Sequence, residues 1–177
     1  MTRTVVILGT VHQIQGAEKF SCKIEDPFYL QLVNQRLDGI DFLFEEASGL
    51  GPTAAQQSIE RQLGTGHYLD IDPHIDTRSE HGIGITGDQF PIDRDAQFTD
   101  SFRREYDIEQ SKREELWVRR VSETDFGIAL LICGYLHTLS LAYKLRLAGF
   151  SVETWTYVPY LRLCPRPHML PGSASTS

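Results

Sequence analysis

The sequence contains no apolar run that approaches the roughly 20 residues needed to cross a bilayer. No charged and then apolar leader precedes residues 4–8, which already have the pattern of a strand. Cysteine is scarce as well: Cys22, Cys133 and Cys164 are far apart and lack the spacing of a metal site. An odd number of separate cysteines is typical of free thiols in a reducing compartment. We therefore expect a cytoplasmic protein without a membrane partner.

Basic residues are outnumbered by acidic ones. Lys and Arg together number 17 and Asp and Glu number 24, which gives a formal net charge of −7. A general nucleic-acid binder needs a basic face to neutralise phosphates, so we expect no nucleic-acid partner. Two further motifs are missing, because Gly9 does not open a G-x-G-x-x-G and no G-x-S-x-G is present. The sequence thus gives no support for a dinucleotide-binding loop or a serine nucleophile elbow.

The length and composition are those of one globular domain. The chain has 177 residues, of which 41% are hydrophobic and 23% charged, and this size suits a single core. We expect one α/β domain over residues 1–164 and a flexible tail over 165–177, which is rich in Pro, Gly and Ser. Residues 64–99 contain many Gly, Asp and single His residues, and we expect them to form a site-covering loop region.

Apolar segments without strict alternation recur along the chain, as in strands that are buried on both faces of a parallel sheet. They lie at residues 4–8, 40–44, 67–71, 127–133 and 151–158. Helical patterns separate them at residues 27–37, 53–64, 100–122 and 138–148. This alternation predicts an α/β fold with a mostly parallel sheet and helices on both faces. A polar site is then expected at the carboxyl ends of the strands.

Two Gly-x-x-His turns follow predicted strands. Gly9 and His12 follow the first, and Gly134 and His137 follow the strand at residues 127–133. Because the carboxyl ends of parallel strands meet at one edge of the sheet, we expect the two imidazoles to converge there. For one isolated histidine, a turn residue that satisfies backbone groups is the competing interpretation.

Glu45 and Glu46 follow another predicted strand. Neighbouring residues in a strand point to opposite faces, so only one of the two is expected to reach the histidines. Two imidazoles with a carboxylate form a plausible site for a divalent metal ion, which we expect to be Zn, Mn, Co or Mg, with open positions for water and substrate. Without a metal, the same groups suit general acid–base catalysis.

Asp70 and Asp72 follow the predicted strand at residues 67–71. They share a face if the strand continues through them, and this arrangement predicts a weaker set of Mg²⁺ ligands. The competing interpretation is an acidic loop that precedes Pro73.

Arg113 lies on the same stripe of a long charged helix as Tyr106 and Trp117. An arginine on an apolar stripe needs an anionic partner, and the candidates are Glu45, Glu46 or a substrate group. In the alternative, the side chain reaches solvent at the edge of the helix. The remaining charged residues of this helix are expected on a solvated face, namely Glu109, Lys112, Glu114, Glu115 and Arg119.

The paired Gly-x-x-His turns, with a glutamate after an intervening strand, resemble the TraB/Tiki family, which is related more distantly to ChaN-like and erythromycin-esterase-like proteins. The matching segments are Val5–His12, Phe42–Glu46 and Leu130–Phe150. The helix of Arg113 looks like the arginine-bearing helix that precedes the second histidine turn in that family. The resemblance implies an α/β fold and a metal-dependent hydrolase, and Tiki proteins act as proteases. This chain is shorter than typical members, and residues 64–99 match no part of the pattern.

Three functions follow from these patterns. The first is a small metal-dependent hydrolase that acts on a small molecule or a peptide. The second is a non-catalytic protein that binds a small ligand or regulates on the same scaffold, and the third is an Mg²⁺-dependent phosphoryl-transfer enzyme centred on Glu45, Asp70 and Asp72. An oligomer is compatible with each. The candidate catalytic residues are His12, Glu45, Glu46, Arg113 and His137, and the candidate metal ligands are His12, Glu45, Glu46 and His137, followed by Asp70 and Asp72.

Overall fold

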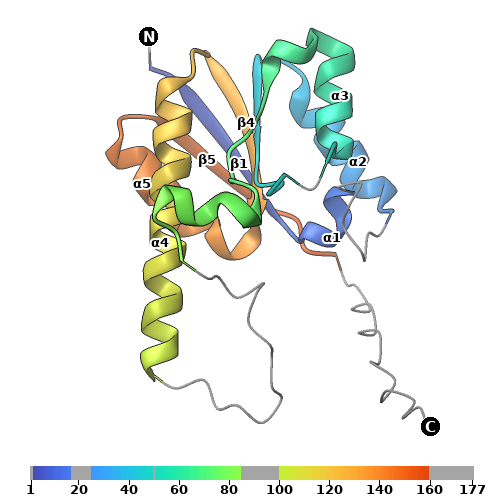
Figure 1. Ribbon diagram of the computed structural model, residues 1–177. Helices are drawn as coiled ribbons and strands as arrows, with labels where there is room; N and C mark the ends of the chain where they lie inside the picture. Colours follow the sequence, from blue (N-terminus) through green and yellow to red (C-terminus); the bar gives the residue numbers. More distant parts are fainter. Residues whose placement is uncertain (1, 17–24, 50, 85–99, 160–177) are drawn as a thin grey trace, which may run out of the picture.

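A five-stranded, all-parallel sheet forms the centre of the molecule (Figure 1). The computed structural model describes residues 2–16, 25–49, 51–84 and 100–159. The strands are β1 (Thr4–Thr10), β2 (Phe42–Glu45), β3 (Tyr68–Asp70), β4 (Ile128–Gly134) and β5 (Ser151–Thr156), and their order in the sheet is β3-β2-β4-β1-β5. Every neighbouring pair is parallel, which confirms the predicted α/β fold.

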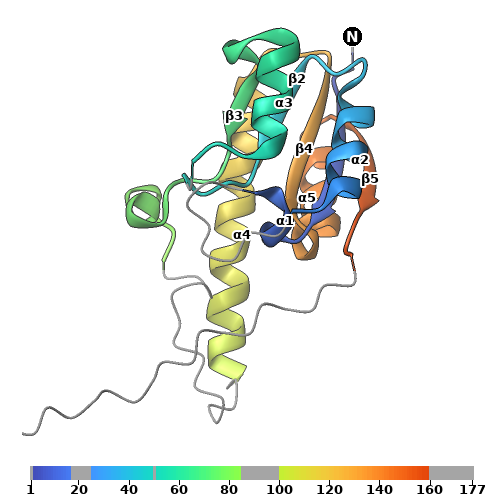
Figure 2. The ribbon, with the colours of Figure 1, turned by 90° about the vertical axis from the view of Figure 1, so that its right-hand side faces the viewer.

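Helices cover both faces of this sheet. On one face lie α4 (Asp100–Glu123) and α5 (Thr138–Leu147), and on the other lie α1 (His12–Gln15), α2 (Pro27–Leu37) and α3 (Ala54–Leu63) (Figures 1 and 2). Each face has its own apolar core. The first contains Ile7, Phe44, Trp117, Leu131 and Leu141, and the second contains Leu8, Tyr29, Val33, Leu43 and Ile132. The side chains of successive strand residues therefore pack in opposite cores, as the pleat of a strand requires.

Two helices on the second face begin where side chains cap their first amides. The Asp26 carboxylate accepts hydrogen bonds from the amides of Phe28 and Tyr29, each at 3.0 Å. Thr53 Oγ1 accepts from the Gln56 amide at 3.1 Å. The Gln56 side chain donates to Glu60 Oε1 at 2.9 Å.

The strand register places the carboxyl ends of the strands at one edge. Thr10 of β1 pairs with Gly134 of β4, and Glu45 of β2 pairs with Ile132 of β4 and Asp70 of β3. The residues that follow these strands therefore start from the same edge of the sheet. This alignment creates the candidate site.

Residues 64–84 of the predicted loop region are largely structured. They contain the 3₁₀ helix η1 (Thr65–His67), strand β3 and the 3₁₀ helix η2 (Ile75–His81). Residues 85–99 and the predicted tail at 165–177 lie outside the described residues, as do Cys22 and Cys164. Cys133 is buried and free. In the described part of the chain, no helix is long and apolar enough to cross a membrane.

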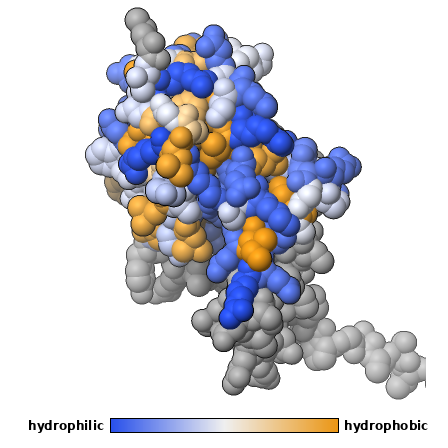
Figure 3. All heavy atoms as spheres, turned by 90° about the vertical axis from the view of Figure 1, so that its left-hand side faces the viewer, coloured by the Kyte–Doolittle hydropathy of each residue, from blue (hydrophilic) through white to orange (hydrophobic). Residues whose placement is uncertain are grey.

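The outer side of α5 is apolar, together with the 3₁₀ helix η3 (Tyr135–His137) that precedes it. Leu136, Leu139, Tyr143 and Leu147 are between 63% and 79% exposed. Figure 3 shows the face of the molecule that carries α4 and α5, where apolar side chains interrupt a polar surface. Contiguous exposed apolar side chains of this kind are typical of contact surfaces.

Candidate functional site

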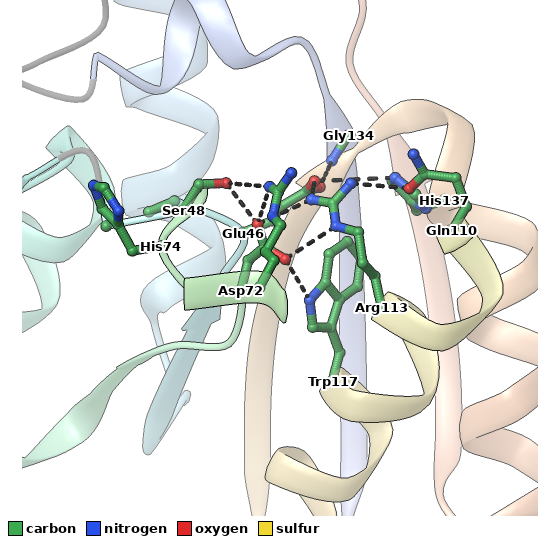
Figure 4. A network of polar contacts seen from close by, with 12 residues as sticks. Glu46, Ser48, Asp72, His74, Gln110, Arg113, Trp117, Gly134 and His137 are labelled. Carbon is green, nitrogen blue, oxygen red and sulfur yellow. Dashed lines mark hydrogen bonds and ion pairs between the residues drawn. The ribbon is translucent and has the colours of Figure 1, made fainter. Parts of the chain in front are cut away.

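Glu46 is the central residue of the candidate site (Figure 4). It follows β2 directly and is 2% exposed, and its amide donates to the Ile132 carbonyl at 2.9 Å. Arg113 Nη2 donates to its Oε1 at 2.7 Å, and the Gly134 amide donates to its Oε2 at 2.8 Å. Burial raises the pKa of Glu46, but the charges of His12, Arg113 and His137 outweigh burial and lower it overall. Glu46 is therefore a buried, ionised carboxylate.

Both predicted histidines face this carboxylate. Nε2 of His12 lies 3.7 Å from Glu46 Oε1, and Nε2 of His137 lies 3.9 Å from the same oxygen. A Cβ placed on Gly134 would lie 3.2 Å from His12 Nε2, 3.4 Å from Glu46 Oε2 and 3.5 Å from His137 Cδ2. The three side chains thus gather around one glycine at the end of β4, and we call them the His12–Glu46–His137 trio.

The other ring nitrogen of each imidazole contacts an acceptor. His12 Nδ1 lies 2.9 Å from Gln15 Oε1, and His137 Nδ1 lies 2.8 Å from Glu114 Oε1. A carboxylate only accepts hydrogen bonds, so the contact with Glu114 places a proton on Nδ1 of His137. The Trp117 ring packs edge-on against His137, with the ring centres 4.9 Å apart.

Arg113 joins Glu46 to a second buried carboxylate, that of Asp72. Its Nε and Nη2 donate to Asp72 at 3.1 and 2.9 Å. Asp72 also accepts from Arg78 at 2.7 Å, from Ser48 at 2.6 Å and from Trp117 Nε1 at 3.0 Å. Burial raises the pKa of Asp72, but the Arg113 and Arg78 cations and the Ser48 hydroxyl lower it overall. Asp72 is therefore a structural anchor for Arg113 rather than part of an exposed acidic loop.

Asp70 supports the loop that follows Glu46. Its carboxylate accepts from the amides of Ala47 at 3.1 Å, Gly49 at 2.7 Å and Asp72 at 3.1 Å. The two histidines lie beside Glu46 rather than beside Asp70 or Asp72, so we do not propose the two aspartates as metal ligands.

Glu45 points to the opposite face of the sheet, away from the trio. Its Oε2 accepts a hydrogen bond from the Thr53 hydroxyl, and its Oε1 is buried without a hydrogen-bond partner in the structure. Burial raises the pKa of Glu45 to about 8, and the hydrogen bond from Thr53 only partly offsets this effect. Of the two candidate glutamates, the structure therefore brings only Glu46 to the histidines.

One expectation from the sequence is wrong. Glu114 was expected on a solvated helix face, but it is 4% exposed and contacts His137. Ser140 Oγ donates to the same Glu114 oxygen at 2.6 Å, and Lys144 Nζ lies 3.1 Å from the other. Burial raises the pKa of Glu114, but these three hydrogen bonds lower it overall. The error arises because α5 packs beside α4 and covers a flank that the α4 pattern alone assigns to solvent.

Sequence reasoning also missed three partners of Asp72, namely Ser48, Arg78 and Trp117 as a donor. Arg78 lies in a stretch without periodicity and carries no local signal. Trp117 was predicted to lie on the same stripe as Arg113. A buried indole N–H needs a hydrogen-bond acceptor, so the sequence did indicate that Trp117 would contact an acceptor such as Asp72.

Imidazole nitrogens and carboxylate oxygens are the atom types that bind divalent metal ions, but in the trio they are widely spaced. Two ligands of a tetrahedral Zn²⁺ ion lie about 3.4 Å apart when each is about 2.1 Å from the metal. The separations of 3.7 and 3.9 Å from Glu46 Oε1 exceed this by a few tenths of an ångström. Within the described residues, no group of three or more His, Cys, Asp or Glu side chains has the arrangement of a metal site.

Gly134→Ala is expected to damage the trio without damaging the fold. The φ of Gly134 is −55°, which alanine adopts without strain, while the new Cβ would press on His12 Nε2 at 3.2 Å. We expect the Zn²⁺ affinity that we propose below to fall about tenfold or more and the free energy of unfolding to change by less than about 1 kcal/mol. Calorimetric metal titration and urea unfolding measure the two effects.

Gly9→Ala is the comparison variant for Gly134→Ala in the unfolding measurement. A Cβ at Gly9 would overlap the Thr138 hydroxyl and lie 3.1 Å from Tyr135 Cα, so this substitution should destabilise the fold by about 1–3 kcal/mol. Equal unfolding losses in the two variants, with Zn²⁺ affinity intact in Gly134→Ala, would contradict the close gathering of the trio.

Comparisons with known proteins add no family to this geometry. No protein-family model matches the chain, and neither the curated proteins nor the solved structures include a match.

Proposed function

We propose that the chain is a small metal-dependent hydrolase in which His12, Glu46 and His137 bind one divalent metal ion. The observation that carries the proposal is that both imidazoles turn Nε2 toward one oxygen of Glu46 while Nδ1 of each contacts a protein acceptor. Metal-binding histidines have this arrangement, because the outer hydrogen bond fixes the ring and its tautomer. The resemblance of the Gly-x-x-His turns to the TraB/Tiki family supports the same function.

The surrounding residues define how such a site would work. A bound ion would polarise a carbonyl or phosphoryl oxygen and lower the pKa of a bound water. Arg113 holds Glu46 in place and keeps it ionised, so that the carboxylate remains available as a ligand. The His12 side chain is 41% exposed, against 12% for His137. Substrate, which we propose to be a small molecule or a peptide, would therefore approach from the His12 side.

Metal titration of four proteins tests the binding step. We expect the wild type to bind one Zn²⁺ ion in isothermal titration calorimetry and His12→Ala and His137→Ala to lose this binding. His67→Ala is the matched control, because His67 contacts the Asp41 carbonyl and lies away from the trio. A wild type that binds no Zn²⁺, Mn²⁺ or Co²⁺ would refute a metal-dependent hydrolase and favour the non-catalytic ligand-binding protein.

Hydrolysis itself needs a separate assay. A panel of carboxylic esters, phosphate esters and fluorogenic peptides should include a compound that the metal-loaded protein cleaves, with turnover lost on chelation and in His137→Ala. Cleavage that persists in His137→Ala would contradict the assigned site. If the protein binds metal but cleaves none of these substrate classes, it is a metal-binding protein and the proposed hydrolase activity is refuted.

A further inference from the structure

The two imidazoles of the trio are held by different groups. A neutral amide oxygen from Gln15, within the single turn of α1, contacts His12 Nδ1. A buried carboxylate, Glu114 of α4, contacts His137 Nδ1. The second arrangement is the stronger one, because hydrogen bonds to an ionised acceptor are about twice as strong as those between neutral groups.

The surroundings fix which oxygen of Glu114 faces His137. Oε1 accepts from Ser140 Oγ at 2.6 Å and contacts His137 Nδ1 at 2.8 Å. Oε2 lies 3.1 Å from Lys144 Nζ. Lys144 extends from α5 to α4, where its Nζ donates to the carbonyl and the hydroxyl of Ser111 at 3.0 and 2.9 Å. A cation thus occupies one end of the carboxylate, and the imidazole occupies the other.

We propose that Glu114 is a positioning residue that keeps a proton of His137 on Nδ1, so that the neutral imidazole has its lone pair on Nε2, the nitrogen that faces Glu46. The importance of this tautomer for metal affinity rests on the proposed function, whereas the tautomer itself does not. A metal ion needs the lone pair on Nε2, so the opposite tautomer would place a proton where the ligand bond should form.

The competing role for Glu114 is purely structural, a bridge from α4 to Ser140 and Lys144 of α5. An isosteric change separates the two roles. In Glu114→Gln, Lys144 would attract the amide oxygen to the position of Oε2, and the NH₂ group would then face His137 Nδ1. That group can only donate, so His137 should move its proton to Nε2. Ser140 Oγ can accept from the same NH₂ and keep its hydrogen bond to the His137 carbonyl.

The experiment reads the tautomer in metal-free protein labelled with ¹⁵N-histidine, by long-range ¹H–¹⁵N spectra at about pH 8.5, where free imidazole is neutral. We expect Nδ1–H for His137 in the wild type and Nε2–H in Glu114→Gln. The double variant Glu114→Gln with Lys144→Met frees the amide to rotate and should restore Nδ1–H. The signals of His12 serve as the internal control and should not change.

Zn²⁺ titration supplies the second measurement. Glu114→Gln should bind Zn²⁺ about 10–100-fold more weakly than the wild type, the range found for outer hydrogen-bond partners of metal-bound histidines. Unchanged thermal unfolding of the variant would show that the loss comes from the histidine rather than from the fold.

Two results would overturn the proposal. One is an Nε2–H tautomer of His137 in the wild type. This measurement does not depend on whether any variant folds. The other is a folded Glu114→Gln protein whose His137 remains protonated at Nδ1, which would leave Glu114 a structural bridge. If the wild type shows Nδ1–H but binds no metal, the proposed function fails while the positioning role of Glu114 stands.

Discussion

Arg113→Ala is expected to lower the free energy of unfolding by about 3–5 kcal/mol, the usual cost of removing one partner from a buried ion pair. Arg113 is 3% exposed and donates to both Glu46, at 2.7 Å, and Asp72, at 2.9 and 3.1 Å. Its loss leaves Glu46 without its cation and removes two hydrogen bonds from Asp72. Urea unfolding at neutral pH measures the difference directly.

Arg119→Ala is the control for this effect. Arg119 is an exposed residue of the same helix, so its removal should change stability by less than about 0.5 kcal/mol. Arg113 lowers the pKa of both carboxylates, so the stability it supplies is present above their ordinary pKa and is lost as the pH falls through the lowered values. The gap between Arg113→Ala and the wild type should therefore narrow in acid. Similar stabilities for the two arginine variants at neutral pH would contradict the buried pairing.

The free energy of unfolding of the wild type is expected to fall steeply as the pH rises, and Glu45→Gln is expected to abolish this fall. The pKa of Glu45 is about 8 in the folded protein, against 4.5 ordinarily, because the carboxyl is buried. Folding therefore favours the protonated acid. The stability contributed by Glu45 is complete below pH 4.5 and is lost as the pH rises to about 8, with a slope near 1.4 kcal/mol per pH unit between these values.

A neutral amide at this position does not titrate, and its oxygen can still accept from the Thr53 hydroxyl. The unfolding free energy of Glu45→Gln should thus be nearly flat where that of the wild type falls, and the variant should be the more stable protein above pH 8. Glu153→Gln, at an exposed position of β5, should follow the wild type. Parallel curves for Glu45→Gln and the wild type would show that Glu45 ionises normally.

The sequence alone predicted the framework because its signals are local. Buried strands need continuous apolar residues, and β1 and β4 have them from Val5 to Leu8 and from Ala129 to Cys133. The Gly-x-x-His turns follow directly from those strands, so parallel pairing alone brings His12 and His137 to one edge. The alternation along β2 likewise required that Glu45 and Glu46 face opposite sides.

The partners of the trio could not be predicted, because they depend on packing between elements distant in the chain. Nothing in β2 tells which of its two faces carries Arg113, which is 67 residues beyond Glu46. Asp72 was expected either as an Mg²⁺ ligand beside Asp70 or in an acidic loop, and neither pattern reveals its hydrogen bond from Arg113, 41 residues later in the chain. Glu114 is a charged residue among charged residues, and only the position of α5 distinguishes it from Glu115.

Anomalous scattering at the zinc absorption edge, from crystals of the Zn²⁺-loaded protein, tests the central claim most directly. We predict one strong peak between His12 Nε2, His137 Nε2 and Glu46, with metal–nitrogen distances of about 2.0–2.1 Å. An ordered site without such a peak, or a peak on other residues while His12 and His137 remain unligated, would contradict the account.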